Sequence, residues 1–335
     1  MFIKLNNLKF LLMSMIFMTI MLSISSLSWL NMWISLEINT MSFIPLMINL
    51  NLKKTSKSMI IYFLIQAISS MNFLFFLIYF FFMNNHNFEK IFILTFTLLM
   101  KMGSAPMYFW FPKVMKNIDW MNNFMLMTWQ KIIPMMLIKY FFEMNLFFMA
   151  ILMNTFLSSI LALNQTNLKL IMAYSSINHL GWLMMSLLMN LNTWIIYFTH
   201  YLLINYILCK LFFLFNMKYM INIFFLKMKI FMKIFILMNF LSLSGLPPFL
   251  GFLPKWIIIL HLMNSKMYLI MFLMLMSALI NIFFYIRLMT TSIIISNYQM
   301  KWYLFYLTPY YSTFFLMNLI YTVYFSILVL SFLLI

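Results

Sequence analysis

Apolar residues occur along this chain in long runs separated by short polar stretches. A helix that crosses a membrane needs about 20 mostly apolar residues. The pattern therefore predicts an all-α polytopic membrane protein with about 11 transmembrane helices in a single membrane domain, 1–335. The expected spans are about 8–28, 31–50, 59–83, 90–112, 123–143, 145–163, 170–190, 194–217, 230–263, 267–295 and 311–333. The opening run is expected to be a spanning helix and not a removable signal, because no small-residue cleavage site follows it.

Two of the expected spans are interrupted by glycine, small residues and proline, with a lysine beside each interruption. The first interruption is KMGSAP at 101–106, and the second is SGLPPFLGFLPKW at 244–256. In lipid, irregular backbone is tolerated only where protein or a water-filled cavity surrounds it. Paired broken helices in two halves of a membrane protein are typical of a transporter's ion pathway.

The positions of the interruptions predict an internal repeat. The broken spans are the fourth and the ninth, and because five is an odd number, a five-helix repeat must be inverted in the membrane. We therefore expect inverted five-helix repeats at 1–143 and 144–295, followed by a C-terminal helix within 296–335. Both breaks are then expected near the bilayer midplane.

The distribution of cations sets the expected orientation. Only Lys90 and Lys266 fall in the loops on one side of the eleven spans. The N-terminal side is much richer, which places the N-terminus on the positive side and the C-terminus on the opposite side. The lysines of the N-terminal side are Lys4, Lys9, Lys53, Lys54, Lys57, Lys113, Lys116, Lys169, Lys218, Lys227, Lys229, Lys233 and Lys301.

Composition excludes several other functions. The chain is 66% hydrophobic and 7% charged, and most of the cations behind its net charge of +17 are these loop lysines. No basic, aromatic-rich polar face indicates nucleic-acid binding. The sequence has no phosphate-binding loop, no dinucleotide fingerprint and no metal-ligand pair, and Cys209 is the single cysteine. We therefore expect no cofactor and no redox chemistry in this chain itself.

Two charged residues inside spans are the first candidates for a functional site. Glu37 is one of only four acidic residues, and Lys101 lies one turn before the first break. Placing such a charge in the bilayer costs roughly 2.5–3.5 kcal/mol or more, so we expect Glu37 to be buried facing a cation in the bundle, and Lys101 to be a buried amine that a nearby carboxylate stabilises. Alternatively, Glu37 is an interfacial glutamate and Lys101 extends to the membrane surface.

Two further lysines are expected in the interior. Lys131 precedes Pro134 in the fifth span, and Lys255 closes the second break. A buried lysine can bind and release a proton, although Lys255 could instead only cap half-helix carbonyls. Lys139 and Glu143 are expected to form a surface pair at i,i+4, and Arg287 is expected to remain charged.

His179 lies in the most polar mid-membrane stretch of the second half, YSSINHLGW at 174–182. Histidine titrates near neutral pH, so His179 is a candidate proton relay. A structural histidine, hydrogen-bonded to a neighbouring helix, is an equal alternative. His200 is a weaker candidate, and His86 and His261 lie near span ends.

Several blocks resemble the antiporter-like membrane subunits of mitochondrial complex I, NADH–ubiquinone oxidoreductase, in a version similar to that of insects. The blocks follow one another in the family order over about 30–260: WISLEIN, KMGSAPMYFWFP, TWQKIIP, LNQT, AYSSINHLGW and LSGLPPFLGFLPKW. Carried over by motif, the family's buried glutamate is Glu37. Its broken-helix lysine is Lys101, its central lysine is Lys131, and its second broken-helix lysine is Lys255.

The resemblance implies a proton-translocating subunit of the NADH:ubiquinone reductase in the mitochondrial inner membrane, with a matrix-side N-terminus and an ion pair between Glu37 and Lys101. Other membrane-arm subunits and phospholipids, including cardiolipin, are then the expected partners, and nucleic acid is not. NADH, flavin, iron–sulfur clusters and ubiquinone would be bound elsewhere in the complex. Two alternatives remain: a free-standing cation/proton antiporter subunit and a non-pumping scaffold subunit.

Overall fold

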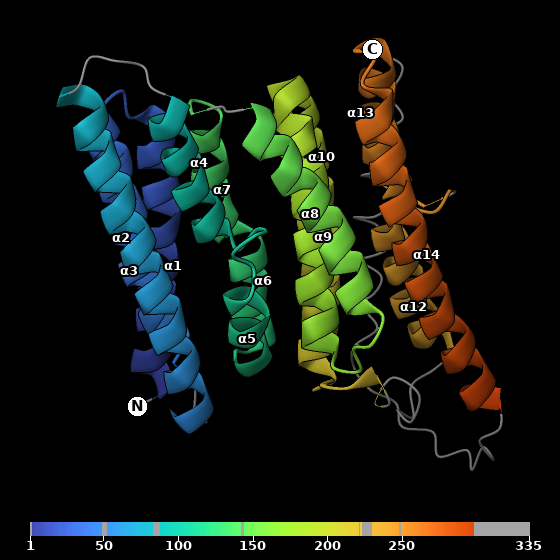
Figure 1. Cartoon of the computed structure of the whole chain (residues 1–335). Helices are drawn as coiled ribbons and strands as arrows, with labels where there is room; N and C mark the ends of the chain where they lie inside the picture. Colours follow the sequence, from blue (N-terminus) through green and yellow to red (C-terminus); the bar gives the residue numbers. More distant parts are fainter. Residues whose placement is uncertain are drawn as a thin grey trace.

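The computed structural model describes residues 2–48, 52–82, 88–141, 144–220, 222, 230–247 and 249–297. This part of the chain is helical throughout, and its one β-type contact is an isolated bridge between Asn167 and Tyr219. The helices run roughly parallel in one bundle (Figure 1). Their bounds are α1 Phe2–Ser25, α2 Trp29–Leu46, α3 Leu52–Phe82, α4 Phe88–Met102, α5 Trp110–Asn117, α6 Trp120–Met127, α7 Trp129–Ile138, α8 Met144–Ala162, α9 Leu168–Met189, α10 Leu191–Leu214, α12 Ile230–Ser244, α13 Phe252–Asn264 and α14 Tyr268–Asn297.

The predicted spans within the described residues coincide with these helices in order. The two interrupted spans are each observed as a pair of helices, α4 with α5 and α12 with α13. The single span predicted at 123–143 is wrong, because the chain bends at Thr128 and forms the separate helices α6 and α7. The predicted helix at 311–333, Glu143, His86, and the loop lysines Lys227, Lys229 and Lys301 lie outside the described residues.

Four of the described helices are both long enough and apolar enough to cross a membrane, namely those within Leu8–Ser25, Thr55–Tyr79, Leu191–Leu214 and Tyr268–Thr291. The other helices are shorter or more polar. Several are short because a break divides them, and α2 and α9 bury polar side chains such as Asn39 and Asn178. The helices that depart most from a simple spanning pattern are therefore those that line the interior.

The first break is closed by a Schellman motif at the end of α4. Gly103 has φ +69°, a left-handed conformation that glycine adopts without a Cβ penalty. The backbone N–H of Gly103 donates to the Met100 carbonyl at 3.1 Å, and that of Ser104 donates to the Leu99 carbonyl at 3.1 Å. The last carbonyls of α4 are thus satisfied inside the bundle, where no lipid-exposed group has to pair with them.

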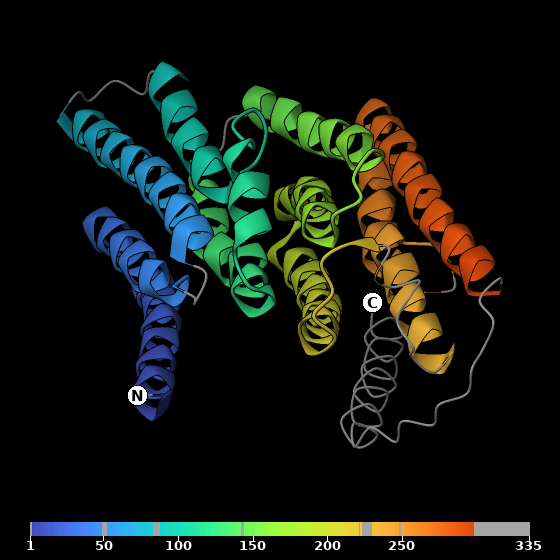
Figure 2. The same ribbon diagram turned by 90° about the horizontal axis from the view of Figure 1, so that it is seen from below.

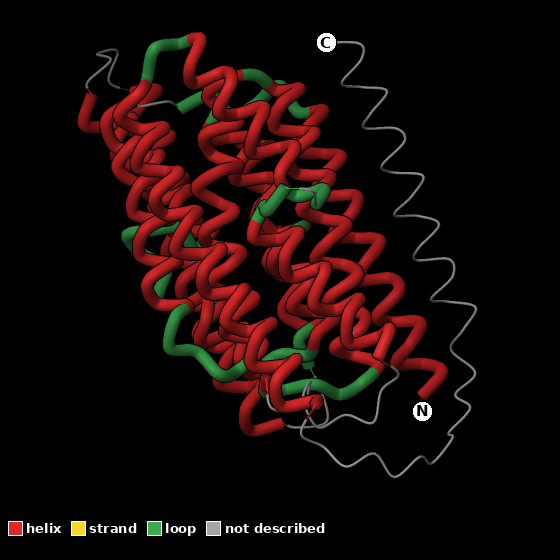
Figure 3. The backbone as a smooth tube through the Cα atoms, turned by 90° about the vertical axis from the view of Figure 1, so that its right-hand side faces the viewer, coloured by secondary structure: helices red, strands yellow, loops and turns green. Residues whose placement is uncertain are grey.

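The second break repeats this cap. Gly245 has φ +79°, and its N–H donates to the Ser242 carbonyl at 3.1 Å, while the N–H of Leu246 reaches the Leu241 carbonyl at 3.5 Å. Both breaks lie near mid-height in the bundle, where irregular segments interrupt the helical tube (Figures 1 and 3). The two interruptions therefore share a backbone geometry as well as a composition.

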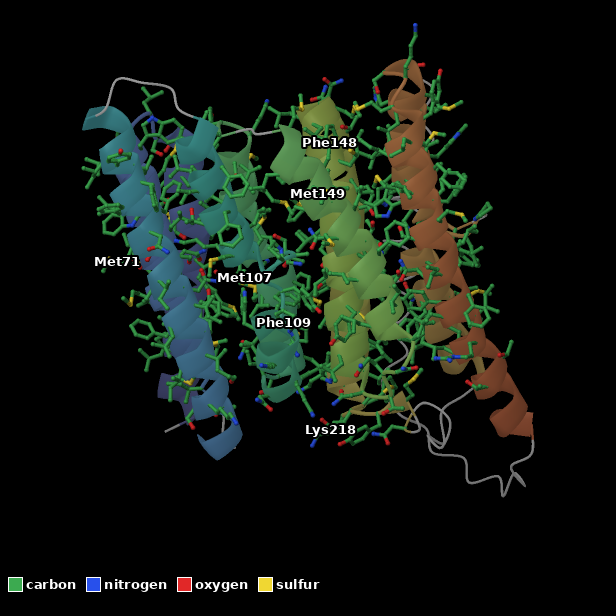
Figure 4. All side chains as sticks on the ribbon, viewed as in Figure 1. Met71, Met107, Phe109, Phe148, Met149 and Lys218 are labelled. Carbon is green, nitrogen blue, oxygen red and sulfur yellow. The ribbon has the colours of Figure 1, made fainter. Side chains whose placement is uncertain are left out.

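The N-terminal helices and α12–α14 lie at opposite ends of the bundle, with α9 and α10 between them (Figure 2). Helix α8 packs closely on α9, because a Cβ on Gly181 would lie 2.5 Å from Thr155 Cγ2. On the outer surface, apolar side chains such as Met71 and Met149 are exposed, whereas Lys218 lies at one end of the bundle (Figure 4). This surface is suited to lipid along its sides.

One side chain connects the first break with α8. The Oδ1 atom of Asn154, which is fully buried on α8, accepts a hydrogen bond of 2.6 Å from the backbone N–H of Ala105. The next residue of α8, Thr155, accepts a hydrogen bond of 3.1 Å at its carbonyl from Asn178 on α9. Adjacent residues of α8 therefore bind the α4–α5 loop on one side and α9 on the other.

Candidate functional site

Lys101 lies in the last turn of α4, directly before the Gly103 cap. Its side chain is 4% exposed, and its Nζ atom has no hydrogen-bond partner among the described residues. The backbone carbonyl of Lys101 accepts a hydrogen bond of 3.1 Å from Gln66 Nε2 on α3. The backbone carbonyl of Met100 accepts one of 3.1 Å from Trp110 Nε1. The carbonyls of Met100 and Lys101 thus each accept a hydrogen bond from a side chain of another helix, while the Lys101 amine has none in this part of the chain.

Glu37 on α2 is the carboxylate whose charge acts on Lys101. Its Oε1 accepts a short hydrogen bond of 2.5 Å from Ser70 Oγ on α3, and its Oε2 accepts one of 3.3 Å from Thr40 Oγ1. Because Lys101 Nζ has no hydrogen-bond partner in this part of the chain, the two groups interact through space without a direct contact. The Ser70 and Thr40 hydroxyls, and not the Lys101 ammonium, thus donate the hydrogen bonds that stabilise the Glu37 carboxylate.

A cluster of neutral polar side chains joins α2, α3 and α7 beside these charges. The amides of Asn39 and Gln130 form reciprocal hydrogen bonds of 3.0 and 3.2 Å, and Tyr62 donates to Gln130 Oε1 at 3.2 Å. All three side chains are buried. Since Gln130 directly precedes Lys131, this cluster links the helix of Glu37 with the helix of the central lysine.

Lys131 is the most enclosed of the site lysines, with 1% of its surface exposed. Its Nζ atom donates to the Ser176 carbonyl on α9 at 3.4 Å. It also lies 4.8 Å from the centre of the Phe111 ring and 5.8 Å from that of Tyr201. A desolvated cation over an aromatic ring gains about 2 kcal/mol, so these rings offset part of the cost of a buried ammonium.

His179 lies on α9, and the charges of Lys131 and Lys255 both act on it. Its Nδ1 atom is 2.8 Å from the hydroxyl of Tyr197 on α10. The side chain is 7% exposed. His179 therefore lies between the central lysine and the second break.

Lys255, in the first turn of α13, reaches back across the second break to the end of α12. Its Nζ donates to the Ser244 carbonyl at 2.7 Å and approaches the Leu243 carbonyl at 3.5 Å. It also lies 5.6 Å from the centre of the Trp182 ring on α9. At the first break, Gln66 binds the Lys101 carbonyl, which is the equivalent of the Leu243 carbonyl. The two lysines therefore occupy different places relative to their caps.

The structure joins Lys131, His179 and Lys255 into one buried row and places Glu37 and Lys101 at its other end, beyond the amide cluster. Sequence reasoning missed the neutral side chains that connect them. The spacing of two pairs of polar residues could have indicated these partners, because residues four positions apart lie on one face of a helix. The pairs are Gln66 with Ser70 and Tyr197 with Tyr201.

Other candidates lie away from this row. Arg287 donates to the Leu163 carbonyl near the end of a neighbouring helix, and Cys209 is buried. Lys139 is exposed at the end of α7, while its expected partner Glu143 lies outside the described residues. Within the part of the chain that the structure describes, no cluster of His, Cys, Asp and Glu side chains could hold a metal ion.

Comparisons with known proteins support the resemblance. Residues 26–281 match the family model "NADH:quinone oxidoreductase/Mrp antiporter, TM". NADH-ubiquinone oxidoreductase chain 2 of Anopheles gambiae is 45% identical over 88% of both chains, and that of Locusta migratoria is 37% identical over 89% of both. Both of these relatives are from insects, which agrees with the insect-like composition of this chain.

Solved structures show the same fold at low sequence identity. A chain of respiratory complex I from Thermus thermophilus is 19% identical with a TM-score of 0.73, over 84% of this chain and 69% of that one. A chain of the Mrp complex from Dietzia sp. is 12% identical with a TM-score of 0.72, over 83% of this chain and 59% of that one. The sequence matches show that this chain, which shares this fold, belongs to the NADH-ubiquinone oxidoreductase chain 2 family, within the NADH:quinone oxidoreductase and Mrp antiporter family.

Proposed function

We propose that this chain is a proton-translocating membrane subunit of respiratory complex I in the mitochondrial inner membrane. The observation that carries the proposal is the buried row of titratable side chains that runs from Lys131 through His179 to Lys255. Charged groups inside a membrane are costly, and they mark ion pathways when they face the interior of a bundle. The family membership supplies the redox partner, since the relatives are chains of an NADH-ubiquinone oxidoreductase.

In this proposal Glu37 and Lys101 form the switch at one end of the row. When the carboxylate approaches the amine, it stabilises the ammonium, and when it turns to Ser70 it leaves the lysine free to release its proton. The second state is supported by the hydrogen bond from Ser70 to Glu37 and by the lack of a partner for Lys101 Nζ among the described residues. Protons would then pass through internal water to Lys131 and along the row to Lys255.

A subunit of this kind would contain two inverted repeats and about 11 spans with a fixed orientation in the membrane. Helices within 1–143 and 144–295 would form the inverted repeats, and a further helix within 296–335 would bring the number of spans to about 11. The four charged sites would lie near one membrane depth. The lysine-rich loops would face the matrix with the N-terminus, and the C-terminus would face the intermembrane space.

The proposed partners of this chain are those of a membrane-arm subunit of complex I. Other membrane-arm subunits, including neighbouring antiporter-like subunits, and phospholipids such as cardiolipin would cover the exposed apolar sides of the bundle. NADH, flavin, iron–sulfur clusters and ubiquinone would be bound by other parts of the complex. The chain would thus be a subunit of the NADH:ubiquinone reductase without redox chemistry of its own.

The fold similarity to the Mrp complex keeps a free-standing cation/proton antiporter subunit as a second candidate. The 45% identity to a complex I chain favours the first candidate, whereas the Mrp chain is 12% identical. Purification separates the two: the chain should co-purify with NADH-dependent quinone reduction. Isolation as part of a complex without that activity would favour the antiporter.

A double-mutant cycle tests the proposed switch. Glu37→Gln and Lys101→Met should each leave the complex assembled and each lower the number of protons moved per electron in reconstituted vesicles. If the two groups act as one unit, the double variant should resemble either single variant, with an interaction energy of about 1 kcal/mol or more. The measurement is the proton-to-electron ratio at a fixed rate of NADH oxidation.

Two results would contradict the proposal. Strictly additive losses would mean that Glu37 and Lys101 are separate sites and not a switch. An unchanged ratio in the fully assembled Lys101→Met complex would favour the scaffold alternative, in which the buried charges only fix the register of the helices.

A further inference from the structure

The amide of Asn154 on α8 is a buried polar group that the proposed pathway leaves without a role. Its Oδ1 atom lies 2.6 Å from the backbone nitrogen of Ala105, in the loop between α4 and α5. Both residues are fully buried, and they lie 49 positions apart in the chain. A helix outside the broken pair therefore holds the loop of the first break.

The direction of this hydrogen bond is unambiguous. A backbone N–H only donates, so the oxygen of the Asn154 amide, and not its nitrogen, must face Ala105. The Nδ2 atom then faces the sulfur of Met184 on α9 at 3.5 Å, which is a weak acceptor. The backbone of the loop thus determines how the amide is oriented.

The other N–H groups of the loop find their acceptors within the break itself. Those of Gly103 and Ser104 donate to carbonyls in the last turn of α4, and Pro106 has no N–H to satisfy. The Ala105 N–H is the donor in this stretch that bonds to a distant helix. Without the Asn154 oxygen it would be a buried donor without an acceptor, which is a costly arrangement.

The last turn of α4, which carries Lys101, is therefore held from two sides. Gln66 on α3 binds the Lys101 carbonyl, and Asn154 binds the loop four residues later. Because Lys101 Nζ has no hydrogen-bond partner among the described residues, the backbone that carries it determines where the amine lies. A shift of the loop would change the distance from this amine to Glu37.

We propose that Asn154 is a positioning residue that fixes the loop of the first break and thereby sets the distance between Lys101 and Glu37. The inference rests on the proposed function, because Asn154 acts through the switch that these two residues form. The bulk of the Asn154 side chain fills space in the core, whereas its oxygen supplies the hydrogen bond. Substitutions of similar size therefore separate the two contributions.

The test is Asn154→Leu in the assembled complex, reconstituted in vesicles. Leucine is similar in size but offers the Ala105 N–H no acceptor. We expect the rate of proton translocation to fall roughly threefold to tenfold, the factor that corresponds to one net hydrogen bond. Asn154→Asp should retain most of the native rate, since a carboxyl group offers an acceptor oxygen at the same place whether or not it is protonated.

Ser159→Ala is the matched control for this experiment. It removes a buried side-chain hydroxyl from the same helix. The Ser159 hydroxyl donates to the Phe156 carbonyl at 2.8 Å within α8, so its loss leaves the contact with the loop intact. This variant should translocate protons as the native complex does.

Amide hydrogen exchange reports on the loop without turnover. In Asn154→Leu the Ala105 amide should exchange roughly threefold to tenfold faster than in the native complex, and in Ser159→Ala it should exchange at the native rate. Asn154→Ala removes the same acceptor without adding bulk, and it gives the same two readouts if leucine prevents assembly. In a Lys101→Met background, Asn154→Leu should have no further effect on translocation, because the amine that it positions is absent.

The outcomes distinguish this inference from the proposed function. If Lys101→Met impairs translocation while Asn154→Leu changes neither the rate nor the exchange, the positioning role is overturned and the switch stands. If Asn154→Leu lowers the rate by the same factor with and without Lys101, Asn154 acts independently of the lysine and the inference is also overturned. If Lys101→Met leaves translocation intact, the proposed function loses its switch. Native exchange of the Ala105 amide in Asn154→Leu overturns the positioning role whatever Lys101→Met shows.

Discussion

Replacing Lys131 with methionine is expected to abolish proton translocation through this chain while the complex still assembles. Methionine keeps an apolar stem of similar length and can occupy the space between the Phe111 and Tyr201 rings. Among the described residues, it removes the one amine that the structure places between the amide cluster and His179. No other described amine or carboxylate contacts this position and could substitute for it.

The size of the effect follows from the enclosure of the site. Lys131 is 1% exposed, so bulk water cannot replace the amine. Loss of a positioned acid–base group commonly costs a factor of about a hundred or more in rate. The proton-to-electron ratio in vesicles is the appropriate measurement, together with NADH oxidation in the presence of an uncoupler.

Lys139→Met is the matched control for this experiment. Lys131 lies in the first turn of helix α7, whereas Lys139 is exposed at the C-terminal cap of the same helix. The control should translocate protons as the native complex does. A native ratio in assembled Lys131→Met would show that protons bypass the centre of the row, and it would overturn the proposed path.

Gly251→Ala is expected to prevent accumulation of the assembled complex. A Cβ at this position would lie 1.7 Å from the carbonyl oxygen of Ser242 and 2.7 Å from its carbonyl carbon. The obstacle is backbone in the last turn of α12, and the same carbonyl accepts the Gly245 N–H in the cap. The two half-helices must therefore separate, at a cost above the roughly 3 kcal/mol of ordinary overpacking.

Native gel electrophoresis of membranes measures this outcome. Gly181→Ala combined with Thr155→Ser is a suitable comparison, because the severe contact of a Gly181 Cβ is with the Thr155 Cγ2 methyl, which serine lacks. This pair should assemble better than Gly251→Ala. Normal assembly of Gly251→Ala would mean that α12 and α13 approach less closely than the structure describes.

The sequence predicts the helical order well because each apolar run is long and punctuated by polar residues. The breaks at Gly103 and Gly245 are also predictable, since glycine beside proline is a strong local signal. The bend at Thr128 is harder to predict. The Thr128 hydroxyl bonds the Phe124 carbonyl at 2.7 Å, and Pro134 provides no N–H for the carbonyl one turn earlier, but neither feature alone interrupts an apolar run.

The charged members of the site could be named from the sequence because charges are rare in an apolar chain. Their neutral partners could not, since serine, tyrosine and glutamine occur throughout the spans. Ser70 is 33 positions from Glu37, and Tyr197 is 18 from His179, so only the packing of the helices selects them. The expected direct contact between Glu37 and Lys101 depends on the conformation of a side chain, which composition does not specify.

The hydrogen bond between Asn154 and the Ala105 N–H has a consequence for allosteric coupling. It attaches the loop beside Lys101 to α8, and the adjacent Thr155 attaches α8 to the Asn178 that precedes His179. A displacement of the loop therefore strains the helix of the histidine unless both move together. A coupling free energy between two sites is reciprocal. If a rearrangement at Glu37 changes the protonation of His179 through these contacts, the protonation of His179 must change the conformation of the first break by the same free energy.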